Sequence, residues 1–135
     1  EYIWNADDLN DIVDGILQEH NQDGTHKAML TTVTSYTPAA AGTAAIDLTD
    51  GNIHNITMPG GDITITATGG TTGQCFMVEI TQDGTGSRTV TWFDTIRWAN
   101  GTEPTLTTTA SKRDTFGFRV TGSGTYDGLV MGQSL

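Results

Sequence analysis

Turn-forming residues recur about every ten residues through most of this chain and divide it into short segments. They stand at Asp50-Gly51, Pro59-Gly60-Gly61, Gly69-Gly70, Asn100-Gly101 and Gly122-Ser123-Gly124. Glycine and asparagine tolerate positive φ, and proline fixes φ at a value that turns need. Segments of this length suit strands, whereas a βαβ unit needs room for a helix. The spacing therefore predicts a mainly β chain, folded as an antiparallel, jelly-roll-like β-sandwich or as a barrel of about eight strands. A short N-terminal α-helix is predicted from the separate, helical pattern of the first segment.

The segments between the turns are rich in Thr and in alternating apolar residues, which is the period-two pattern of strands with one buried face. A first, extended strand is expected over 29–36. The further expected strands cover 44–48, 52–58, 62–67, 74–81, 88–92, 106–108, 113–120 and 126–130.

The clearest alternation lies between Cys75 and Trp92. The polar run 82–87 in its middle contains glycines that allow the chain to reverse, so we predict a hairpin with its buried face at Phe76, Val78, Ile80, Val90 and Trp92. We also predict one core that contains Val78, Val90, Trp92, Phe116 and Phe118. Cys75 is the only cysteine, so no intrachain disulfide is possible, and we expect it to pack in the core as a small hydrophobe.

The charge balance excludes several classes of partner. The formal net charge is −10, with only six Lys and Arg residues, whereas phosphate binding needs clustered cations. Nucleic acid and anionic membrane surfaces are therefore not expected partners. Neither a run of about 20 apolar residues nor a signal-peptide pattern occurs, so membrane insertion is not expected. The first residue is Glu1, which indicates a piece cut from a longer polypeptide or a processed terminus.

The first 24 residues have the apolar spacing of an amphipathic helix. Asn5 is a suitable N-cap, and Asp23-Gly24 ends the pattern. The apolar stripe consists of Leu9, Ile12, Val13, Ile16 and Leu17. So short a helix is marginally stable alone and must pack on its own β-domain or on copies of itself. We therefore divide the chain into 1–38, a helix and linker strand for trimerisation or attachment, and 39–135, a β-sandwich domain.

Metal sites and catalytic groups find little support. A calcium loop counted from Glu19 fails, because Leu30 stands where a bidentate Glu is required. His20 and His26 would each be presented three times on a three-fold axis, but a solvent-facing turn is the simpler interpretation. Asp94 and Glu103 bracket a loop and are the one candidate acid–base pair. No nucleophile elbow, phosphate loop or zinc signature is present, so we expect no cofactor, no metal and no enzymatic activity.

Two connections are the candidate ligand-contact region, since recognition falls on loops that a β-scaffold holds. They are 93–104 and 121–126. The candidate contact residues are Arg97, Trp98, Asp94, Glu103 and Tyr126, with Trp98 expected to be the exposed tryptophan. The alternative is that both loops cap the sandwich or pack on the next subunit.

The order of motifs from about residue 40 to 129 resembles a β-domain of tailed-phage virion proteins, especially tail fibres and receptor-binding proteins. The resemblance is carried by GTAAIDLTDGNIHNITM, GQCFMVEITQDGTGSRTVTW and NGTEPTLTTTASKRDTFGFRVTGSGTYDGLV, while WNADDLNDIVDGILQEHNQDGTHKA resembles the helical junction that precedes such domains. Phe93 follows the first tryptophan of the pattern, where such domains often have proline. The resemblance implies a homotrimer at the surface of a phage particle and transfers no catalytic residue.

The predicted function is a structural fibre or decoration domain that contacts itself, other virion proteins and a host-surface glycan. A different class, a carbohydrate-binding module of a secreted glycan-degrading protein, would not need a self-associating leader helix. A third, a depolymerase, would need a carboxylate pair in a groove.

Overall fold

The computed structural model describes residues 32–93 and 95–135 of the 135-residue chain. This part is mainly β, with strands in two sheets. The elements are β1 (Val33–Tyr36), β2 (Thr43–Asp47), β3 (Ile53–Thr57), β4 (Ile63–Thr68), β5 (Cys75–Thr81), β6 (Val90–Thr91), β7 (Thr95–Trp98), the 3₁₀ helix η1 (Ala99–Gly101), β8 (Arg113–Gly122) and β9 (Thr125–Gly132). Within the described residues, no helix is long and apolar enough to cross a membrane.

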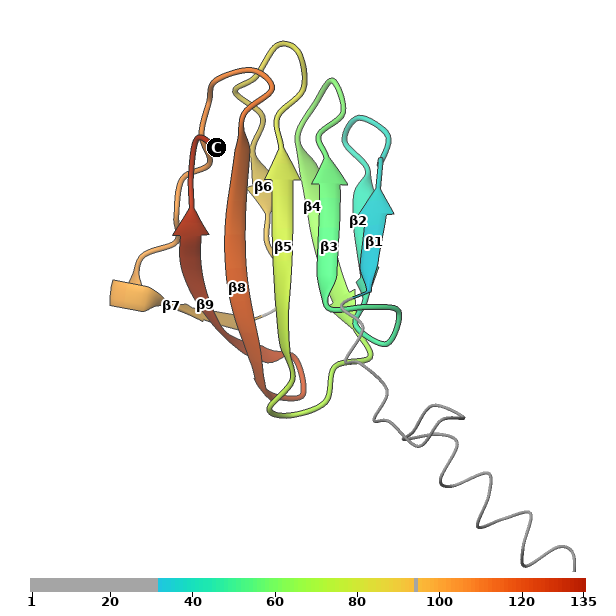
Figure 1. Ribbon diagram of the computed structural model, residues 1–135, viewed down its shortest axis with the longest axis vertical. Helices are drawn as coiled ribbons and strands as arrows, with labels where there is room; N and C mark the ends of the chain where they lie inside the picture. The colour runs from blue at the N-terminus through green and yellow to red at the C-terminus, as the bar shows by residue number, and fades with distance from the viewer. Residues whose placement is uncertain (1–31, 94) are drawn as a thin grey trace, which may run out of the picture. The chain divides into compact units, whose positions relative to one another are not determined.

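From β1 to β6 the chain alternates between the two sheets. The odd strands join the large sheet, ordered β1-β3-β5-β8-β9-β7, and the even strands form the small sheet, ordered β2-β4-β6. All four strand pairs made within this part are parallel. Parallel neighbours cannot be joined by a tight turn, and here a strand of the other sheet makes the connection. Figure 1 shows the small sheet behind the large one, so this part is a flattened coil in which each turn adds one strand to each sheet.

The predicted antiparallel arrangement is wrong for this coil, and the predicted hairpin over 75–92 is wrong with it. β5 pairs with β3 and β8 in the large sheet, while β6 pairs with β4 in the small one. The glycines of the connection do reverse the chain, but it returns in the opposite sheet. Both arrangements bury the same alternate side chains, so the alternation could not distinguish them.

The connection between β5 and β6 is fixed by its own side chains and by a distant segment. The Gln82 side chain makes two hydrogen bonds with the Arg88 backbone, Nε2 donating to the carbonyl at 2.9 Å and Oε1 accepting from the N–H at 3.0 Å. Asp83 Oδ1 accepts from the backbone N–H groups of Thr85 and Gly86. Gly86 has a φ of +78° and lies so close to the Thr108 carbonyl that a Cβ could not fit. The DGTG sequence therefore holds the connection between β5 and β6 in a fixed conformation.

The last part of the chain extends the large sheet with a different topology. β8 is antiparallel to both β5 and β9, and β7 is parallel to β9 at the sheet edge. The expected strand over 106–108 does not form, and β7 lies where a loop was expected. The polar–apolar alternation of Thr95 to Trp98 was a signal for this strand that the nearby Asn100-Gly101 turn obscured.

One core lies between the sheets and contains side chains from both. It includes Ile46 and Ile65 of the small sheet, and Val78 and Phe116 of the large one, all at most 1% exposed. Val90 and Trp92 are partly buried against the same cluster. The predicted core of Val78, Val90, Trp92, Phe116 and Phe118 is confirmed.

A buried carboxylate fixes the end of the chain to the segment before β8. Asp114 is 2% exposed and accepts three hydrogen bonds, from the Thr107 N–H at 2.6 Å, the Thr107 hydroxyl at 2.7 Å and the Ser134 N–H at 3.0 Å. The bonded groups satisfy the charge that burial would otherwise penalise. Asp114 therefore sets the course of the chain on both sides of the β8–β9 hairpin.

The N-terminal helix and its apolar stripe fall outside the described residues, as do His20 and His26, so these stay predictions. The division of the chain into 1–38 and 39–135 also stays a prediction. Within the expected linker, residues 33–36 form β1, the edge strand of the large sheet.

Candidate functional site on the outer face of the large sheet

The outer face of the large sheet carries three rows of side chains that run across the strands in register. The central row is apolar and consists of Val33, Ile53, Met77, Gly117 and Leu129. On one side lies a row of Cys75, Arg119, Asp127 and Arg97. On the other side lies a polar row of Ser35, Asn55, Glu79 and Thr115. Strand pairing thus collects on one face side chains that are far apart in the sequence.

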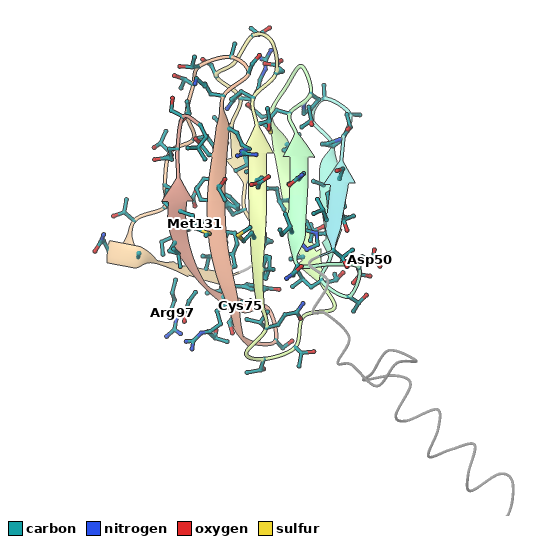
Figure 2. The ribbon with its side chains drawn as sticks, viewed as in Figure 1. Asp50, Cys75, Arg97 and Met131 are labelled. Atoms are coloured by element: carbon teal, nitrogen blue, oxygen red, sulfur yellow. The ribbon has the colours of Figure 1, made fainter. Side chains whose placement is uncertain are left out.

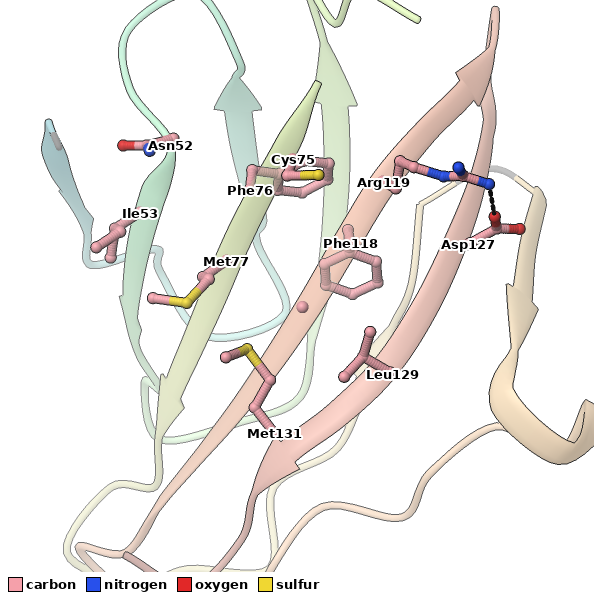
Figure 3. Close-up of a pocket in the computed structure, with 11 residues that line it drawn as sticks. Asn52, Ile53, Cys75, Phe76, Met77, Phe118, Arg119, Asp127, Leu129 and Met131 are labelled. Atoms are coloured by element: carbon pink, nitrogen blue, oxygen red, sulfur yellow. Dashed lines mark hydrogen bonds and ion pairs between the residues drawn. The ribbon is translucent and has the colours of Figure 1, made fainter. Parts of the chain in front are cut away.

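An open groove of about 720 Å³ follows the apolar row. Figure 3 shows its floor on β5 and β8, with Leu129 and Met131 of β9 along one side and Asn52 and Ile53 along the other. The glycine at 117 makes the groove possible, since a Cβ there would lie 3.0 Å from Met131 Sδ and 3.6 Å from Leu129 Cγ. Leu129 and Met131 remain 50% and 56% exposed.

A carboxylate between two guanidinium groups borders the groove. Asp127 accepts from Arg119 Nη2 at 2.7 Å and forms a second ion pair with Arg97 Nη2 at 2.8 Å. The hydrogen bond from Arg119, reinforced by the positive charge of Arg97, lowers the pKa of Asp127 below its ordinary value. On the opposite side of the groove, Arg113 and Glu79 form an ion pair at 3.3 Å.

Cys75 lies in this groove, and the prediction that it packs in the core is wrong. Its side chain is exposed and points to the outer face, opposite in direction to its buried neighbour Phe76. Figure 2 shows Cys75 and Met131 on the face of the large sheet that is turned toward the viewer. The strand alternation, rather than the general tendency of cysteine to be buried, decides its position.

The predicted ligand-contact residues are distributed over different environments. Arg97 is exposed and bound to Asp127, whereas Tyr126 is buried at 3% exposure. Glu103 is exposed on the segment after η1. Asp94 lies outside the described residues, so the candidate acid–base pair stays untested. The two expected loops do come together, because β7 pairs with β9 from Thr95 opposite Thr125 onward.

The expected exposure of Trp98 is wrong, because its ring is partly buried against the core. The ring centroids of Trp98 and Trp92 are 5.2 Å apart in an edge-to-face arrangement, and Phe118 lies 5.5 Å from Trp98. The ring packs over Gly128, where a Cβ would lie 2.9 Å from two of its carbons. A smaller hollow of about 290 Å³ remains beside this aromatic pair, with Thr91 and Glu103 in its lining.

No group of three or more His, Cys, Asp and Glu side chains suited to a metal ion occurs among residues 32–93 and 95–135.

The sequence did contain a signal for the apolar groove that the prediction missed. Leu129, Val130 and Met131 form an unbroken apolar run on a strand that was expected to have one polar face. Alternation requires that such a run exposes apolar side chains on both faces unless both faces are covered.

Comparison with known proteins gives one match. The family model described as "Putative phage tail fibre C-terminal domain" matches residues 36–125, which is two thirds of the chain. Neither a curated protein nor a solved structure matches. The matched range begins in β1 and ends at the start of β9.

Proposed function

The chain belongs to the family of putative phage tail fibre C-terminal domains, and from this we propose that it is a rigid structural domain of a homotrimeric fibre on the phage particle. Its partners are other copies of itself, neighbouring virion proteins and a host-surface glycan. We interpret the two facing sheets as a sandwich, built by a coil followed by an antiparallel hairpin.

The observation that supports a structural role is that buried polar side chains hold the segments between strands in place. Gln82 and Asp114 are 4% and 2% exposed, and their side chains make hydrogen bonds to connecting segments and to the chain end. A fibre must keep its shape under load, which requires connections that do not move independently of the sheets. We propose no enzymatic activity for this domain, and the reaction of a depolymerase would require Asp94 and Glu103 to act together.

Glycan contact is a second candidate function, favoured by the hollow beside Trp98 and Trp92. Aromatic ring edges, the Thr91 hydroxyl and the Glu103 carboxylate together suit a sugar, which has apolar ring faces and hydroxyl groups. The same chemistry would suit a carbohydrate-binding module of a secreted protein. The predicted helix with Leu9, Ile12, Val13, Ile16 and Leu17 favours the fibre.

Mass measurement of the native full chain tests the structural proposal. We expect three times the 14.4 kDa chain mass at micromolar concentration, and deletion of residues 1–24 should weaken assembly more than it lowers the melting temperature of the β-domain. A monomer of the full chain would contradict the trimer.

Glycan contact is tested separately by glycan-array binding of the full chain. Because Trp98 supports the core, the informative variants are Glu103→Gln and Thr91→Val, with Thr105→Val as a control outside this hollow. Loss of binding with the first two variants would support the contact, and binding that survives both would remove it from this hollow.

A further inference from the structure

We propose that the outer face of the large sheet is the surface through which copies of this chain pack on one another, with the groove at the centre of the contact. The inference rests on the proposed homotrimer and adds to it the surface that holds the copies together. It follows from the shape of the face, from the charges around it and from the contrast with the rest of the molecule.

The apolar row is long enough to be a protein contact. It crosses five strands, and at a spacing of about 4.8 Å between strands it spans roughly 19 Å. Five large hydrophobic side chains are exposed in the described part of the chain, and Val33, Leu129 and Met131 are among those on this face. Contiguous apolar surface on this scale marks interaction sites.

The surface has the form of an interface core with a polar rim. The apolar row lies between the Arg119–Asp127–Arg97 ion pairs on one side and the Arg113–Glu79 ion pair on the other. Apolar centres surrounded by polar and charged groups are the usual organisation of protein–protein contacts. Gly117 leaves a hollow in the centre, and the flexible Met131 side chain beside it can adapt to an inserted group.

The charges indicate that the occupant is a second copy. Each chain carries a formal charge of −10, so copies repel one another wherever acidic surfaces meet. The strands of the large sheet carry on this face three arginines, Arg97, Arg113 and Arg119, against two acids, Glu79 and Asp127. The small sheet carries one charged strand residue, Asp47, and no cation. Of the two sheets, only the large one therefore offers strand cations to an acidic neighbouring copy.

Charge substitutions on the two outer faces test this inference. Met131→Lys and Leu129→Lys place a cation on half-exposed positions beside the groove, so each folded chain should remain as stable as the parent. Burying that cation between copies should weaken assembly roughly tenfold or more, measured by native mass over a dilution series. Thr66→Lys, which makes the same charge change at an exposed position of the small sheet, is the matched control and should assemble like the parent.

The only cysteine supplies a second readout that needs no substitution. Cys75 lies in the groove and is exposed in a single chain, so packing of copies there should slow its reaction with a maleimide roughly tenfold. Met131→Lys should restore fast labelling. A trimeric parent with fast labelling, or trimers of Met131→Lys and Leu129→Lys as tight as the parent, would overturn the inference and leave the trimer standing. A monomeric parent would overturn both.

Discussion

The two sheets have outer faces that follow the same strand alternation but differ in chemistry. The small sheet presents threonines, with Thr43, Thr64 and Thr91 in one row and Thr66 beside Ala45 in the next. The large sheet presents Val33, Ile53, Met77 and Leu129 at the equivalent positions of its central row. Threonine has the β-branched shape that strands favour and a hydroxyl that binds water, whereas the four apolar side chains bind none.

This difference shows that alternation and residue type carry separate information. Alternation decides which side chains point away from the core, and it does so equally in both sheets. The type of residue then indicates what the outward face is suited to contact. We interpret the small sheet as a water-facing surface and the large sheet as a protein-facing one.

The largest loss of stability is expected at a side chain of the core that lies between the two sheets. Trp92 contacts Phe93, Trp98, Phe116 and Phe118 between the sheets. Trp92→Ala should lower the free energy of unfolding by about 3 to 5 kcal/mol, measured by urea denaturation, because it leaves a cavity in the shared core. Thr91→Ala, at an exposed neighbouring position, is the control. A melting temperature within a degree or two of the parent would show that Trp92 is not a core residue.

A smaller effect is expected at Asp114, which lies on β8 of the large sheet. Asp114→Ala removes the acceptor of three hydrogen bonds and should cost about 2 to 3 kcal/mol, since the bonds made by this buried carboxylate to Thr107 and Ser134 are lost. Amide hydrogen exchange should become faster at Ser134 and Thr107. Asp62→Ala is the matched control, because Asp62 is exposed and accepts a hydrogen bond from the Thr89 N–H. Equal effects of the two substitutions would contradict the role given to Asp114.

The stability of the protein should also depend on pH through His54, which lies on β3 of the large sheet. The ring is fully buried, hydrogen-bonded to Tyr36 at 3.2 Å, and burial lowers its pKa from 6.5, while the Gly51 backbone and the Asp50 and Asp47 carboxylates oppose the shift. Because the folded pKa lies below that of the unfolded chain, stability is complete above about pH 6.5 and falls as pH decreases through the folded pKa.

Denaturation midpoints measured between pH 7.5 and 5 should show this loss in the parent, and His54→Phe should remove the slope. The carboxylates of Asp47, Asp83 and Asp127, whose pKa values are lowered by their hydrogen bonds, contribute only at lower pH. A slope that persists in His54→Phe would assign the pH dependence to another group.

The smallest effect tests the water-facing interpretation directly. Thr66→Val makes the small sheet more like the large one at one exposed position, and stability should change by no more than about 0.5 kcal/mol. Native mass should stay that of the parent, whereas Met77→Thr, the reverse change on the large sheet, should weaken assembly. Association driven by Thr66→Val would show that copies also meet through the small sheet.

The sequence by itself determined most of the strands and the face that each buries. The period-two patterns around Ile46, Ile65, Val78 and Phe116 are local, and burying one face of a strand requires nothing beyond that alternation. The family resemblance also came from the sequence, since the order of motifs is a property of the chain alone. The exposed position of Cys75 follows from the same alternation, which overrides the general tendency of cysteine to be buried.

Only the tertiary structure decided which strands pair. After the anchored DGTG connection, the chain could return beside β5 or in the opposite sheet, and both choices bury Val90 and Trp92. The choice depends on hydrogen bonds with distant groups, such as that from the Ser87 N–H to the Thr108 carbonyl. The burial of Trp98 was likewise decided at a distance, because Gly128 provides the space for its ring.

The candidate interface depended on the tertiary structure for the same reason. Three strand pairings, one parallel and two antiparallel, must set the register before Ile53, Met77, Gly117 and Leu129 become neighbours. A shift of one residue in any pairing would turn that strand's outward side chains toward the core. Local patterns determine what each strand can bury, and long-range pairing determines which surface the outward side chains make together.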